Sequence, residues 1–298
     1  MLTGSVERLA TVKPVVLCYC GKIQKMAKRA SYWKVFDDYH HNVNYTEIFM
    51  AAISKCCGEL DFSSVKSCLT VGPGDGQYKV AFIKQCVGNT SQLIAVDHDH
   101  ESVERLKVNL AKNLPNVESQ VIETNIERWK GIDGQVDLVL LMNVLYYVRA
   151  NDRKELYKKM HEEWLASDGR VVVVSVSRTK CPGNACELLD RLGTPILAWE
   201  DIESELLEAG FIKQYAHEMQ CLRDFSNIDE YFLCFLSYLI NGPIALDDVR
   251  SVIEELYPEG KSDQMFHTLA VFQKAQWTWL ILHSAVPNST SPKYAHGD

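Results

Sequence analysis

The sequence predicts an α/β protein with a doubly wound, mostly parallel sheet of seven strands and a helical cap. Three observations predict this architecture. Apolar runs of strand length alternate with amphipathic helical stretches, which is the pattern of parallel βαβ units. Two runs, "VDLVLLMN" at 136–143 and "RVVVVSVS" at 170–177, have a continuous apolar centre, as expected for strands buried on both faces. A glycine-rich turn follows the first strand.

The expected elements follow from hydrophobic spacing and from helix start and stop signals. Strands are expected at 66–72, 92–97, 119–124, 136–143, 170–177, 211–219 and 267–273. Helices are expected at 47–58, 77–87, 101–113, 151–166, 199–209, 228–240 and 246–257. Asp99 is expected to cap the third of these helices, and Asp168-Gly169 to stop the fourth.

These elements predict one domain at residues 26–275, with a helical insertion at 220–265. Residues 1–25 lack any helical or strand period, and Met26 reads like a second start. They are therefore interpreted as an N-terminal extension or a gene-model artefact. Residues 276–298 are polar and turn-rich at their end, and are expected to form a disordered tail.

Composition excludes several classes of function. The net charge is −8, from 31 basic and 39 acidic residues, and no basic stripe supports a nucleic-acid partner. No apolar run reaches the roughly 20 residues that span a bilayer, and residues 12–20 make a poor secretory signal, so a cytoplasmic location is expected. The protein is also expected to be a monomer. The ten cysteines form no CxxC pair, which favours reduced thiols. His98 and His100 lack an evident third ligand, so no metal is expected.

The turn after the first strand is the strongest functional motif. It reads Gly72-Pro73-Gly74-Asp75-Gly76, and its glycines allow a sharp turn and close approach of a ligand. Gln77 replaces the third glycine of the dinucleotide fingerprint, and the Gly-Lys-Ser/Thr ending of a phosphate loop is absent. The spacing G-x-G-x-G instead resembles the first motif of class I methyltransferases.

Polar residues follow the next two strands. Asp97 ends the second strand and can accept both hydroxyls of a ribose, although it could instead cap the following helix. Thr124 and Asn125 follow the third strand, where they could hold an adenine edge or form an ordinary turn. These positions indicate a nucleoside-containing cofactor.

Residues 136–177, above all "LYYV" after the fourth strand, resemble the histamine N-methyltransferase family of class I S-adenosylmethionine-dependent methyltransferases. Segments 31–42 and 196–211 are also similar, and the resemblance covers about 28–274. It implies S-adenosyl-L-methionine as methyl donor and a small amine as acceptor. It assigns cofactor contacts to Gly72, Gly74, Gly76, Asp97, Thr124 and Met142, and the acceptor pocket to Tyr32, Phe36, Asn143, Tyr146 and Tyr147.

The acceptor side departs from the family pattern. Tyr45 stands at the family's glutamate, with Glu47 two residues later, and Asn143 replaces a glutamine. His267 replaces an asparagine, and two pocket tryptophans have no counterpart. Methyl transfer is therefore a better supported expectation than histamine as the acceptor.

The chemistry requires alignment more than acid–base catalysis. The sulfonium methyl group is already electrophilic, so the protein must orient an acceptor lone pair and exclude water. Asn143 is expected to orient the acceptor nitrogen, and Tyr146 and Tyr147 to wall the pocket. The sequence thus predicts an N-methyltransferase acting on a small amine, histamine or a related imidazole or aromatic amine. Two alternatives stay open: a methyltransferase with another acceptor class, and a non-catalytic S-adenosylmethionine-binding protein.

Overall fold

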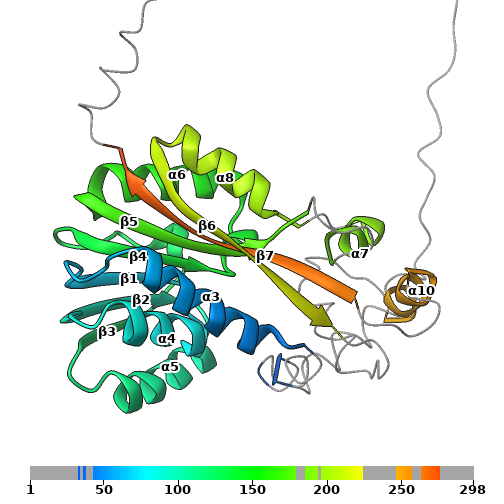
Figure 1. Ribbon diagram of the computed structural model, residues 1–298, viewed down its shortest axis with the longest axis horizontal. Coiled ribbons are helices and arrows are strands. Elements are labelled where there is room, and N and C mark those ends of the chain that lie inside the picture. Colours follow the sequence, from blue (N-terminus) through cyan, green and yellow to red (C-terminus); the bar gives the residue numbers. More distant parts are fainter. Residues whose placement is uncertain are drawn as a thin grey trace, which may run out of the picture. The chain divides into compact units, whose positions relative to one another are not determined.

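A seven-stranded sheet with the strand order β3-β2-β1-β4-β5-β7-β6 organises the protein (Figure 1). The computed structural model describes residues 33, 36–37, 43–178, 185–193, 196–223, 246–256 and 263–275. Strands β1 to β5 pair in parallel, and β7 runs antiparallel to β5. The strands are β1 (Ser67–Val71), β2 (Gln92–Asp97), β3 (Glu118–Glu123), β4 (Val136–Met142), β5 (Leu165–Val176), β6 (Phe211–Arg223) and β7 (Asp263–Lys274).

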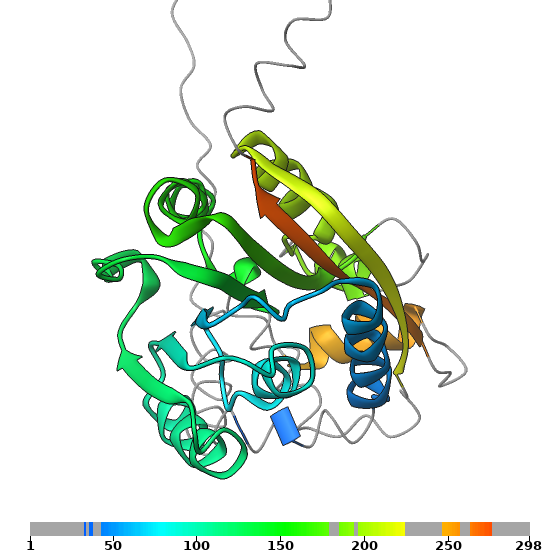
Figure 2. The same cartoon turned by 60° about the vertical axis from the view of Figure 1, so that its left-hand side comes forward.

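The described helices are α3 (Tyr45–Glu59), α4 (Gln77–Cys86), α5 (His100–Asn113), α6 (Ala150–Lys159), α7 (Ala185–Arg191), α8 (Trp199–Glu208) and α10 (Leu246–Leu256). Three shorter helical turns are η1 (Ile126–Arg128), η2 (Leu145–Tyr147) and η3 (Met160–Trp164). Helices α4 and α5 lie on one face of the sheet, and α6 and α8 on the other (Figure 2). None of the described helices is long and apolar enough to cross a membrane.

The chain divides into two compact units, which are described separately. Among the described residues, the larger unit combines 49–176, 197–219 and 267–275 and contains most of the sheet. The described residues of the smaller unit lie within 33–48, 177–196 and 220–266.

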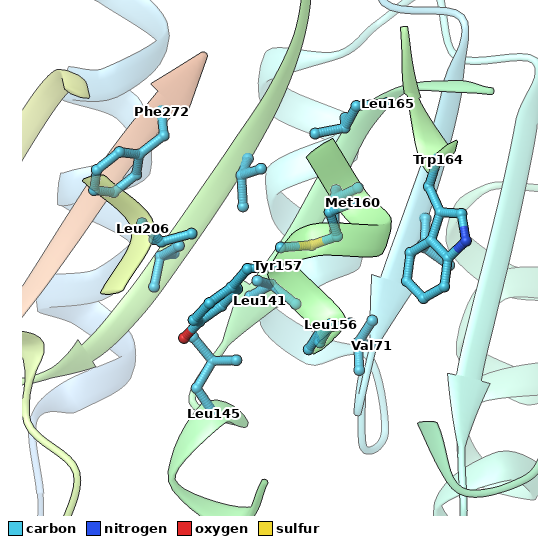
Figure 3. Packing of buried hydrophobic residues seen from close by; sticks show 14 of the residues in the cluster. Val71, Leu141, Leu145, Leu156, Tyr157, Met160, Trp164, Leu165, Leu206 and Phe272 are labelled. Carbon is cyan, nitrogen blue, oxygen red and sulfur yellow. The ribbon is translucent and has the colours of Figure 1, made fainter. Parts of the chain in front are cut away.

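Burial explains the continuous apolar strands. Val139 and Leu141 of β4 pack into the core under α6 and α8, together with Tyr157 and Leu206 (Figure 3). Leu138, Leu140 and Met142 alternate with them toward the other face and are also fully buried. Both faces of β4 are thus covered by helices, which confirms the interpretation of such runs as central strands.

One predicted boundary is wrong. Helix α6 ends at Lys159, and a π-type turn, η3, continues the chain to Trp164. Asp168-Gly169 lies inside β5 rather than at a helix end. The pairing of β5 with β4 shifts in this region, so the extra residues form a bulge. Asp-Gly occurs both in bulges within strands and in turns after helices, so the sequence alone could not distinguish the two.

The segment between β6 and β7 is described only in part. Strand β6 runs to Arg223 and β7 begins at Asp263, so the ends of the range 220–265 are strands. Helix α10 forms within it as expected. Elsewhere, α7, which lies between β5 and α8, is a helix that the sequence pattern did not predict. The expected helix at 228–240 lies outside the described residues, as do 1–25 and 276–298.

A disulfide joins Cys57 of α3 to Cys86 of α4, whose Cα atoms are 5.1 Å apart. The expectation of reduced thiols is therefore wrong for this pair. Its members are 29 residues apart and meet only because α3 and α4 pack together, which residue spacing does not reveal. The free cysteines among the described residues are Cys56, Cys68, Cys186 and Cys221.

Candidate cofactor and acceptor site

The loop after β1 depends on glycine for its shape. Gly72, Gly74 and Gly76 have φ angles of +54°, +62° and +79°, a region that disfavours side chains. A Cβ atom on Gly72 would lie 2.3 Å from Cγ2 of Val144, and one on Gly76 2.4 Å from Cδ1 of Leu106. The same loop therefore turns sharply and lets α5 and the end of β4 approach its backbone.

Asp97 fastens this loop to the end of β2. Its carboxylate, in a residue only 7% exposed, accepts hydrogen bonds from the Gly74 amide at 2.9 Å and the Asp99 amide at 3.1 Å. Each oxygen retains a lone pair for a further donor, such as a ribose hydroxyl. Asp99 caps α5 by accepting a hydrogen bond from the Ser102 amide at 2.8 Å. This confirms the prediction that Asp99 is the cap of that helix.

Sequence reasoning missed Lys79, in the first turn of α4. This lysine is 8% exposed, and burial lowers its pKa to about 8 although Asp75 and Asp97 act in the opposite direction. Its neighbour Val80 belongs to the buried side of the same helix. A lysine among the apolar residues of a short helix was the available signal, and Lys79 is near enough to Asp75 and Asp97 for their charges to act on its pKa.

The end of β3 lies beside Asp97. The Thr124 amide donates to the Asp97 carbonyl at 2.8 Å, whereas Asn125 is exposed and directly precedes η1. Nδ1 of His100 lies 2.9 Å from Oε2 of Glu123, and this hydrogen bond raises the pKa of His100. Among the described residues, no three His, Cys, Asp or Glu side chains cluster as metal ligands.

The end of β4 combines an unusual backbone with two aromatic rings. Met142 is fully buried, and Asn143 has a φ of +53°, the one positive value among the described non-glycine residues. Asparagine tolerates this conformation better than most residues, and such strain often accompanies function. The rings of Tyr146 and Tyr147 have centroids 4.5 Å apart, and Tyr147 is 41% exposed.

These residues come from neighbouring parallel strands, so the glycine loop, Asp97, Thr124 and Asn143 share one edge of the sheet. Ligands of open α/β sheets bind at this edge. His267 is buried on β7, where it pairs with Val176 of β5.

The remaining acceptor-side candidates belong to the smaller unit. The ring of Phe36 packs edge-on against Trp33 with centroids 5.3 Å apart. Glu47 is exposed in the first turn of α3, whereas Tyr45 is only 5% exposed. Tyr32 lies outside the described residues.

Residues 68–169 match the family described as a methyltransferase domain. The match begins in β1 and ends in β5, so it includes the glycine loop, Asp97 and the two tyrosines. This match and the fold support an S-adenosylmethionine-dependent methyltransferase, and they support the cofactor expected from the sequence.

Solved structures show the same fold. A proposed methyltransferase from Bacillus halodurans is 15% identical, with a TM-score of 0.56 over 76% of this chain and 99% of that chain. The YcgJ protein of Bacillus subtilis is 13% identical, with a TM-score of 0.52 over 76% and 98%. The N-methyltransferase NodS of Bradyrhizobium japonicum, solved with S-adenosyl-L-homocysteine, is 16% identical, with a TM-score of 0.48 over 76% and 88%. No curated protein matches this chain. The class I methyltransferase fold expected from the sequence is confirmed.

Proposed function

We propose that this protein is an S-adenosylmethionine-dependent N-methyltransferase whose acceptor is a small amine, either histamine or a related imidazole or aromatic amine. The observation that carries the proposal is the end of β4. There an asparagine in the left-handed conformation precedes two packed tyrosines, at the sheet edge that also holds the glycine loop and Asp97.

The residues of this edge fit the donor. The glycine loop turns sharply at positive φ and is held close to Val144 and Leu106, a backbone shape that we assign to donor binding. Asp97 is assigned to the ribose hydroxyls, and Thr124 and Asn125 to the adenine edge. Met142, which is fully buried at the end of β4, is assigned to the donor by the family resemblance. When bound, S-adenosylmethionine supplies an electrophilic methyl group on a positively charged sulfur.

The acceptor residues orient and enclose rather than exchange protons. The Asn143 amide holds the acceptor nitrogen by one hydrogen bond. The ring faces of Tyr146 and Tyr147 enclose the acceptor and attract the positively charged sulfonium of the donor. A neutral amine or imidazole can release its proton to water after transfer, so no strong base is needed.

Histamine is the leading single acceptor, on the strength of the family resemblance. That family has an acidic residue at the position of Tyr45, which is buried here. Glu47 is exposed two residues later, so of these two residues it is the one that can meet an ammonium group. His267 and Phe36 are assigned to the same acceptor by the resemblance.

The test separates donor binding from methyl transfer. Binding of S-adenosyl-L-homocysteine is measured calorimetrically, and methylation of histamine and an amine panel is followed with labelled donor. Asn143→Gly suits the left-handed backbone and removes only the amide, so we expect turnover to fall about 10- to 100-fold with unchanged donor affinity. Asp97→Asn should do the reverse and weaken donor binding, by about 10-fold or more.

Each alternative has its own outcome. Donor binding without turnover of any acceptor would favour a non-catalytic S-adenosylmethionine-binding protein. Turnover of another acceptor class, with none of any amine, would favour a methyltransferase with that acceptor class. Absence of donor binding in the wild-type protein would refute the cofactor assignment. Full turnover by Asn143→Gly would show that the acceptor site lies elsewhere.

A further inference from the structure

The turn that carries the two tyrosines is anchored on both sides. Leu145 opens η2 and is buried in the core with Tyr157 of α6 and Leu206 of α8, where Figure 3 shows it next to Tyr157. At the other end, the Val148 carbonyl accepts a hydrogen bond of 2.6 Å from Nη1 of Arg153. Tyr146 and Tyr147 lie between these two anchors.

Arg153 is itself held by α8. Its Nε and Nη2 donate to the two carboxylate oxygens of Glu205 at 2.9 and 2.7 Å. The arginine is 7% exposed, and the hydrogen bond to Glu205 raises its pKa, so the guanidinium stays charged. One planar group therefore joins α6, α8 and the end of η2, a geometry that arginine provides and lysine does not.

Stability alone is a weak explanation for this pair. Replacing a buried ion pair by apolar residues of similar size is often neutral or stabilising. Such a replacement would preserve the packing of α6 on α8 but would remove the hydrogen bond to Val148. What the charged pair adds is control of the backbone immediately after the two tyrosines.

We propose that Arg153, held by Glu205, is a positioning residue for the acceptor site, because it fixes the turn Leu145–Tyr147 and thereby the rings of Tyr146 and Tyr147. This inference rests on the proposed function, in which these rings wall the acceptor. Arg153 is not assigned any contact with the reacting atoms.

The decisive variant is Arg153→Met with Glu205→Leu, which removes the clamp and leaves no unpaired buried charge. Arg153→Lys is a second variant, since lysine keeps the charge but cannot reach the Val148 carbonyl and both carboxylate oxygens together. Ile202→Val is the matched control: it removes one methyl group from the same buried face of α8.

Ring placement is read without any acceptor. The protein is labelled with 3-fluorotyrosine, and the signals of Tyr146 and Tyr147 are assigned with Tyr146→Phe and Tyr147→Phe. Donor affinity is measured with S-adenosyl-L-homocysteine, melting temperature by circular dichroism, and turnover with histamine.

In the double variant we expect a melting temperature within about 5 °C of wild type and a donor affinity within about twofold. The two fluorine signals should move toward those of mobile tyrosines, and kcat/KM for histamine should fall about 10- to 100-fold. The lysine variant should shift the same signals, and the Ile202→Val control should leave both readouts unchanged.

Wild-type fluorine signals in both the double variant and the lysine variant would overturn the inference and leave Arg153 a structural residue. If the double variant does not fold, the lysine variant decides the question by the same signals. A wild-type protein that does not methylate histamine would count against the proposed acceptor, whereas the fluorine signals would still decide the role of Arg153.

Discussion

Replacement of Lys79 by methionine should stabilise the protein at neutral pH. Lys79 is buried in the first turn of α4, and burial lowers its pKa from 10.5 to about 8 against the opposing effect of Asp75 and Asp97. The depressed pKa means that the folded state disfavours the ammonium form. Methionine has a similar length and suits an apolar site without carrying a charge.

The size and sign follow from proton linkage. A difference of about 2.5 pH units corresponds to at most about 3.4 kcal/mol at pH 7, where both the folded and the unfolded chain carry the proton. We expect Lys79→Met to raise the free energy of unfolding at pH 7 by about 1–3 kcal/mol. Between pH 8 and 10.5 the unfolded state binds more protons, so the wild-type protein gains stability from this group as the pH rises.

Urea unfolding of both proteins at pH 7 and pH 9 tests this reasoning. The advantage of the variant should shrink by about 1.3 kcal/mol between the two pH values. Burial raises the pKa of Cys56, Cys68 and Cys221 to about 12, so ionisation of the unfolded thiols lowers stability at high pH in both proteins and cancels in their difference. A variant that is less stable than wild type at pH 7, with a gap that does not change with pH, would show that the two aspartates hold the ammonium favourably.

Two further predictions concern the loop and the disulfide. Gly76→Ala should lower the free energy of unfolding by about 1–3 kcal/mol and weaken S-adenosyl-L-homocysteine binding, because its Cβ meets Leu106 at a φ of +79°. The control Gly58→Ala, with open space in α3, should stabilise by about 0.5 kcal/mol; equal effects of the two in urea unfolding would refute the packing argument. Reduction by a dithiol should lower the free energy of unfolding by about 2–4 kcal/mol, since the Cys57–Cys86 bridge closes a loop of about 30 residues. Cys57→Ser with Cys86→Ser should be insensitive to the reagent, and a wild-type protein equally insensitive would contradict the bridge.

The sheet could be predicted because its determinants are local. A strand buried on both faces requires a continuous apolar run, and β4 and β5 have such runs. The loop after β1 could also be predicted from local sequence, because its backbone has positive φ angles that few residues other than glycine tolerate. The bulge at Asp168-Gly169 was missed because it depends on how β5 is registered against β4, which is a property of two strands.

Features that depend on two elements meeting in space escaped the sequence reading. Cys57 and Cys86 lie on different helices, as do Arg153 and Glu205, and nothing in their spacing reveals the pairing. Lys79 is different: it sits on an apolar helix face and was available as a signal, but lysine is so common on surfaces that its burial depends on the packing of α4.

The same physical distinction separates donor from acceptor. The residues expected to bind the donor, from Gly72 to Met142, end consecutive parallel strands or follow them directly, so the fold brings them to one edge whenever the strands form. Each can therefore be predicted from a strand and the residue after it. The acceptor candidates Phe36, Glu47 and His267 come from separate stretches, and which side chain is available depends on tertiary burial, as the buried Tyr45 and exposed Glu47 show. Under the proposed function, specificity for an amine depends on side chains whose burial or exposure the sequence pattern does not determine. The variants of Asn143 and Arg153 test it more directly than further sequence patterns can.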